Sequence, residues 1–90
     1  MSNDRPRPTL AQLKIAVATY HAVLDRYEEA KFIYRGCEKR ELVFLDAGRP
    51  IPPDLQAETK RAFDNIDAWH FNLQEAFRRV GNIAIDIKFD

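Results

Sequence analysis

Residues 20–34, YHAVLDRYEEAKFIY, place tyrosines at positions 20, 27 and 34. A seven-residue step drifts by only about 20° around a straight helix, so these tyrosines are expected to form one column. Around them, apolar and aromatic residues recur at spacings of three and four, with one lysine among them, which is typical of an amphipathic helix. The members of this strip are Leu10, Leu13, Val17, Tyr20, Leu24, Tyr27, Lys31 and Tyr34.

The first helix is predicted to run from about Leu10 to Arg35. Thr9 and Gln12 have the spacing of a capping box, in which each side chain satisfies a backbone amide at the helix start. Gly36 is expected to end the helix, because glycine adopts the left-handed conformation found just past many helix ends. The polar residues 1–8 contain two prolines and are predicted to be a disordered tail.

Residues 40–46, RELVFLD, are predicted to form a short strand. They are rich in valine, leucine and phenylalanine, and the following AGRPIPP, with three prolines and a glycine, is typical of a loop. The alternative is that residues 40–46 prolong the first helix. That alternative would place Gly36 and the charged residues 38–41 in the middle of a helix.

A second helix is predicted to follow Asp54, a favourable N-cap residue, and to stop at Gly81. Phe63, His70 and Phe77 form a column with the same seven-residue step as the tyrosines. We expect the two helices to meet along these aromatic rows. The apolar positions that define the helix are Leu55, Ala62, Ile66, Trp69, Leu73, Ala76 and Val80.

The carboxyl end, IAIDIKFD, shows strict alternation and is predicted to be a second strand with one buried face. The buried residues of that strand are expected to be Ile83, Ile85, Ile87 and Phe89. A two-stranded sheet is marginal alone and would expose an apolar edge. We therefore assign these four residues to a dimer interface.

The resulting fold class is α+β: two long amphipathic helices packed on a small sheet, in the order α-β-α-β, with the sheet completed by dimerisation. Ninety residues allow one domain with a thin core, predicted to span residues 9–90. Fourteen basic residues balance fourteen acidic ones, which disfavours nucleic acid as a partner. No apolar run is long enough to span a membrane, and the single cysteine suits a reducing cytoplasm.

The residue types do not favour catalysis, so the chain is predicted not to be an enzyme. The only serine is Ser2 in the tail, and no glycine-rich phosphate loop is present. Cys37 has no histidine near it in sequence and is interpreted as an ordinary thiol. The pairs His21/Asp25 and Asp67/His70 have helical spacing, but neither has a partner motif on the other helix, so no metal or other cofactor is predicted.

The predicted function is that of a noncatalytic protein-interaction module, such as a small accessory inhibitor of the kind that phages or mobile elements encode. Its partners are expected to be another protein and a second copy of itself. The alternatives are a nucleic-acid-associated regulator and a dimeric protein that sequesters a small ligand. The tyrosine column is interpreted first as a buried seam and second as a recognition stripe, in which case the partner-binding residues are Tyr20, Tyr27, Tyr34, Arg78 and Arg79.

Overall fold

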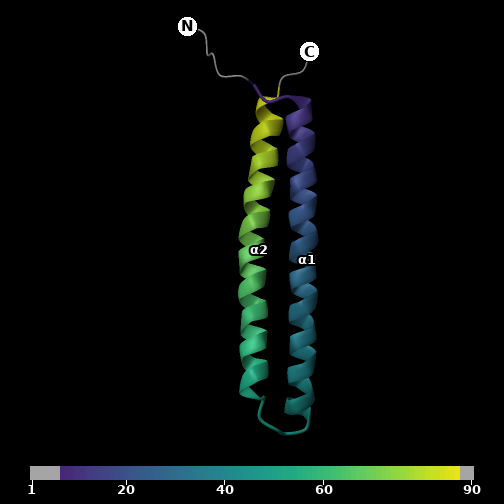
Figure 1. The fold of residues 1–90 in the computed structure, drawn as a ribbon, viewed down its shortest axis with the longest axis vertical. Coiled ribbons are helices and arrows are strands. Elements are labelled where there is room, and N and C mark those ends of the chain that lie inside the picture. The colour runs from purple at the N-terminus through teal and green to yellow at the C-terminus, as the bar shows by residue number, and fades with distance from the viewer. Residues whose placement is uncertain (1–6, 88–90) are drawn as a thin grey trace.

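The chain forms a hairpin of two long antiparallel helices in the computed structural model, which describes residues 7–87 (Figure 1). Helix α1 spans Leu10–Asp46 and helix α2 spans Pro53–Asp86. The hairpin is a thin rod with extents of 71 × 21 × 14 Å. The loop lies at one end of the rod, and the amino end of α1 and the carboxyl end of α2 lie together at the other.

The predicted start of α1 is confirmed. The Thr9 hydroxyl accepts a hydrogen bond from the Gln12 amide at 3.2 Å, and the Gln12 side-chain oxygen accepts one from the Thr9 amide at 2.8 Å. These two bonds complete the capping box and satisfy amides that have no partner inside the helix.

The predicted end of α1 at Gly36 is wrong, because the helix continues for ten more residues to Asp46. Gly36 is exposed, with no atoms within 4 Å of the position a β-carbon would occupy, and costs about 1 kcal/mol relative to alanine. Burial of Cys37 and partial burial of Phe44 in the following turns oppose that cost. The predicted strand over residues 40–46 is therefore wrong, and its alternative, a prolonged helix, is correct.

The glycine that ends α1 is Gly48, which has a φ of 67°. The Gly48 amide donates to the Leu45 carbonyl at 3.0 Å, and the Arg49 amide donates to the Phe44 carbonyl at 2.8 Å. This pair of bonds is a Schellman motif, which satisfies carbonyls left open at a helix end. Residues 47–52 then form the predicted loop.

Helix α2 begins two residues earlier than predicted. Its N-cap is Pro52 rather than Asp54, and Pro53 takes the first helical position, where a missing amide proton costs nothing. Asp54 lies within the first turn, where its negative charge is favourable to the helix dipole. The Gln56 side-chain amide donates to the Ile51 carbonyl at 3.1 Å and holds the loop against the helix start.

The predicted end of α2 at Gly81 is also wrong, since the helix continues to Asp86. The predicted strand over residues 83–90 is contradicted for its described part, where residues 83–86 are helical. Phe89 lies outside the described residues. Because residues 7–87 contain two helices and no strand, the α+β class and the sheet completed by dimerisation are wrong, and the fold is a helical hairpin.

The helices meet along a seam whose members are spaced alternately three and four residues apart, the heptad pattern of a coiled coil. Every member is buried or half-buried. Helix α1 contributes Leu13, Ala16, Tyr20, Val23, Tyr27, Ala30, Tyr34, Cys37, Glu41 and Phe44, and α2 with its C-cap contributes Leu55, Thr59, Ala62, Ile66, Trp69, Leu73, Ala76, Val80, Ile83 and Ile87.

The seam of α1 is rotated from the strip expected from its sequence. The expected strip paired the tyrosines with Leu10, Val17, Leu24 and Lys31, whereas the seam pairs them with Ala16, Val23, Ala30 and Cys37. Both strips share the tyrosines. Helix α1 therefore carries a second apolar edge beside the seam.

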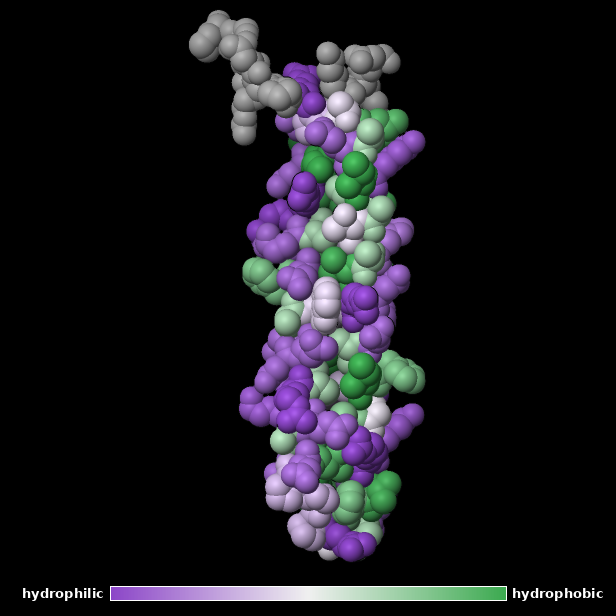
Figure 2. Space-filling view, in the orientation of Figure 1, coloured by the Kyte–Doolittle hydropathy of each residue, from purple (hydrophilic) through white to green (hydrophobic). Residues whose placement is uncertain are grey.

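Little of the molecule is buried. Between residues 7 and 87 the buried hydrophobic residues are Ala16, Ala30, Cys37, Leu55, Ala62 and Ile87, of which three are alanines. The broad face seen in Figure 2 shows hydrophobic side chains at the surface between hydrophilic margins. A two-helix hairpin has no third layer to cover such side chains, so a large apolar surface stays in contact with water.

Candidate interaction surfaces

The two predicted aromatic rows do meet, and the antiparallel arrangement pairs them in order. Ring centroids are 5.9 Å apart for Tyr20 and Phe77, 5.8 Å for Tyr27 and His70, and 5.8 Å for Tyr34 and Phe63. The rings are tilted, as is favourable for aromatic pairs at these distances. We name the surface formed by these six residues, with Val17 and Leu24 beside them, the aromatic face.

The aromatic face is only partly covered by the hairpin itself. The three tyrosines and the flanking Val17 and Leu24 are half-buried, whereas Phe63 is 49% exposed and Phe77 is 66% exposed. At the middle of the face the Lys31 ammonium lies 4.7 Å from the centre of the Tyr27 ring, in a cation–π contact. The pairs therefore hold the helices together and still present phenylalanine rings to solvent.

A hollow of about 530 Å³ lies on the aromatic face near the Tyr20–Phe77 pair. It combines aromatic walls with the Arg78 guanidinium at its rim. That guanidinium forms an ion pair with Glu75 at 2.9 Å. Its lining residues are Tyr20, His70, Leu73, Gln74, Phe77 and Arg78.

At the other end of the aromatic face, the environment of Tyr34 is acidic. Partial burial raises the pKa of the Tyr34 hydroxyl, and the neighbouring carboxylates of Glu38 and Glu41 raise it further. The aromatic face thus has carboxylates at its loop end and a guanidinium near its opposite end.

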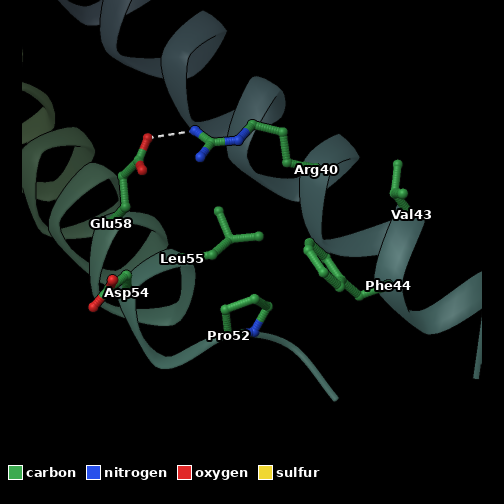
Figure 3. Close-up of a pocket in the computed structure, with 7 residues that line it drawn as sticks. All are labelled: Arg40, Val43, Phe44, Pro52, Asp54, Leu55 and Glu58. Carbon is green, nitrogen blue, oxygen red and sulfur yellow. Dashed lines mark hydrogen bonds and ion pairs between the residues drawn. The ribbon is translucent and has the colours of Figure 1, made fainter. Parts of the chain in front are cut away.

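A second surface is a cavity of about 400 Å³ beside the loop (Figure 3). Phe44 of α1 and Leu55 of α2 form its apolar walls, Pro52 closes it from the loop, and the Arg40–Glu58 pair spans the two helices above it. The remaining lining residues are Val43 and Asp54. We name it the loop-end cavity.

The Arg40–Glu58 pair links the helices beside the loop-end cavity. The Arg40 guanidinium donates to the Glu58 carboxylate at 2.6 Å, and the Cys37 thiol approaches the same oxygen at 3.8 Å. The hydrogen bond from Arg40 lowers the pKa of Glu58, and the bond to Glu58 raises the pKa of Arg40. Both side chains are about half-exposed, so this is a surface pair of modest strength.

The predicted partner-binding residues are not all brought together. Tyr20, Tyr27, Tyr34 and Arg78 lie on or at the rim of the aromatic face. Arg79 instead lines hollows with Thr19, away from the Phe77 ring. That these residues bind a partner stays a prediction.

The residues predicted for a dimer interface are divided by the helix. Ile83 is half-buried in the seam and Ile87 is buried, while Ile85 is 87% exposed. Phe89 lies outside the described residues. The assignment of these residues to a dimer interface stays a prediction, but the strand on which it was based is absent from residues 83–86.

The residues considered for catalysis and metal binding do not form a reactive cluster. Cys37 is buried in the seam, and the four residues of the pairs His21/Asp25 and Asp67/His70 are exposed. In the described part of the chain, no group of three or more histidine, cysteine or carboxylate side chains is placed to hold a metal ion. Likewise, neither described helix combines the length and apolar content that crossing a membrane requires.

The class defined by these features is an antiparallel two-helix hairpin with an apolar face beside its seam. No family model, curated protein or solved structure matches the chain.

Proposed function

We propose that this chain is a noncatalytic interaction module that binds a protein partner through its aromatic face. The observation that carries the proposal is the exposure of Phe63 and Phe77 on the same surface as three tyrosines. Phenylalanine and tyrosine are both enriched in the buried cores of protein interfaces, and tyrosine is frequent among the residues that contribute most to binding. A helical surface of the partner would cover these rings and the adjoining Val17 and Leu24.

We further propose that the module resides in the cytoplasm, because its single cysteine is a buried free thiol in the seam. Such thiols are retained in a reducing compartment. A buried thiol also serves packing rather than chemistry, which agrees with a noncatalytic role.

The test is affinity capture from the native host with three versions of the chain, compared by quantitative mass spectrometry. The double variant Phe63→Glu/Phe77→Glu places two charges on the aromatic face. The control Phe71→Glu changes a phenylalanine that is similarly exposed, at 61%, but lies about 100° around α2 from His70.

We expect one specific protein, either a host protein or an untagged copy of this chain, to be retained by the wild type and by Phe71→Glu and to be lost from the double variant. Helicity measured by circular dichroism should be the same for all three. A partner retained equally by all three versions would exclude the aromatic face as the binding surface.

A further inference from the structure

The hairpin exposes more surface than a compact monomer of its mass. Its accessible surface is 7242 Å², whereas a compact protein of 10.5 kDa exposes about 5,400 Å². The difference of about 1,800 Å² exceeds the roughly 800 Å² that each partner contributes to a standard protein interface. The elongated shape therefore leaves accessible more extra surface than one copy would bury in a standard interface.

The apolar pattern is also wider than a two-helix seam needs. A coiled-coil seam uses two positions of every seven, whereas the core-facing side of a helix in a bundle uses a third position beside them. Helix α1 supplies that third position with Val17 and Leu24, and α2 supplies it with Phe63 and Phe77. These are the side chains that would become core if two more helices covered them.

We infer that the aromatic face closes on a second copy of this chain, so that two hairpins form a four-helix bundle about a two-fold axis. This inference rests on the proposed function, because it names the partner that the aromatic face takes. The chain has no net charge, so two copies approach without overall repulsion.

The charges of the aromatic face favour hairpins that point in opposite directions. The Tyr27–His70 pair lies midway between the other two aromatic pairs, each seven residues or about 10 Å away along the helices. A two-fold axis through this middle pair would bring Arg78 of one copy within about one helical turn of Glu38 of the other. Hairpins that point the same way would instead place Glu38 and Glu41 of both copies at one end.

The first test is the mass in solution at micromolar concentration, measured by light scattering and sedimentation equilibrium. We expect about twice 10.5 kDa for the wild type and for Phe71→Glu. Phe63→Glu and Phe77→Glu should each weaken the dimer roughly 30-fold or more, because a charge would enter the centre of the interface. A wild type that is monomeric throughout this range overturns the inference.

The second test measures the distance between two loop ends, and it does not depend on whether the charged variants fold. A nitroxide on Arg49→Cys, in a Cys37→Ala background, reports this distance by double electron–electron resonance. The opposed arrangement predicts at least about 55 Å, the length of α1. A distance on the order of 20 Å, equal to two interhelix spacings, would contradict it.

The capture experiment and the mass measurement together separate dimer formation from the binding of a host protein. A monomeric wild type that captures a host protein, and loses it in Phe63→Glu/Phe77→Glu, overturns the second copy and leaves the aromatic face as a binding surface. A dimer whose dissociation constant is unchanged in the double variant places the dimer elsewhere and overturns the inference as stated.

Discussion

The final turns of the two helices are both rich in apolar residues, but they bury them differently. At the end of α1, residues 42–45 are four consecutive apolar residues, and only Phe44 is half-buried while the other three are exposed. At the end of α2, two of the three isoleucines, Ile83 and Ile87, lie in the seam, and the third, Ile85, is exposed. The two ends thus differ in how much apolar surface remains uncovered.

The difference follows from helical geometry. Consecutive residues are about 100° apart, so a run of four surrounds the helix and a single neighbouring helix covers one of them. Ile83 and Ile87 are four apart and share one side, whereas Ile85 projects to the other. The last turn of α1 consequently exposes more large apolar side chains than the last turn of α2.

The largest expected effect on stability comes from placing a charge at Ile83 near the end of α2, with Ile85 as the matched control. Ile83→Asp should lower the free energy of unfolding by on the order of 3 kcal/mol, because a carboxylate would enter the seam. Ile85→Asp should change it by less than about 0.5 kcal/mol. Urea unfolding followed by circular dichroism measures both, and a larger loss for Ile85→Asp would restore the strand with a buried Ile85.

At the α1 end the matched pair is Phe44→Ala and Val43→Ala. Phe44 is a half-buried wall of the loop-end cavity, so its truncation should cost about 2 kcal/mol, somewhat below the range for fully buried phenylalanines. Val43 is exposed and its truncation should cost about 0.5 kcal/mol or less. Equal losses in thermal unfolding would mean that both sides of this turn are covered.

Gly36→Ala and Gly81→Ala should each raise the free energy of unfolding by about 0.5–1 kcal/mol. Both glycines lie inside helices, and an added β-carbon would meet no atom within 4 Å. A control is Gly48→Ala, which should destabilise, because Gly48 has a φ of 67°. Destabilisation by either helical substitution would mean that the corresponding helix ends at its glycine.

The smallest effect concerns the pH dependence of the Arg40–Glu58 pair at the loop end. The pKa of Glu58 is lowered from its usual value of 4.5 in the folded state, so the pair contributes fully above pH 4.5. This contribution is lost as the pH falls through the lowered pKa and the carboxylate binds a proton. In acid unfolding, the free energy of unfolding should depend less steeply on pH in Glu58→Gln than in the wild type. Identical curves would show that the Arg40–Glu58 pair does not contribute to stability.

The amino end of α1, the loop and the meeting of the aromatic rows could be predicted, because each depends on local spacing. The helix ends differ from the prediction because Gly36 and Gly81, which are typical of helix ends, lie inside helices here. The missed signal is the regular three-and-four spacing from Leu55 to Ile87, which continues through Gly81 without interruption. Ile83 and Ile87 satisfy both that spacing and the alternation expected of a strand.

The site was only partly predictable for a different reason. Small seam residues such as Ala16 and Ala30 give a weak apolar signal, so the sequence favours the strip containing Val17 and Leu24 as the buried one. The loop-end cavity combines residues 40–44 with residues 52–58. Its apolar walls flank the predicted loop, but their meeting depends on the position of both helix ends.

One seam runs past both Gly36 and Gly81 to the ends of the two helices. Backbone nuclear magnetic resonance assignments test it directly through the Cα secondary chemical shifts of residues 37–46 and 82–86. The hairpin predicts positive, helical shifts throughout both segments. Negative shifts in either segment, accompanied by cross-strand nuclear Overhauser contacts, would contradict the hairpin and restore a sheet.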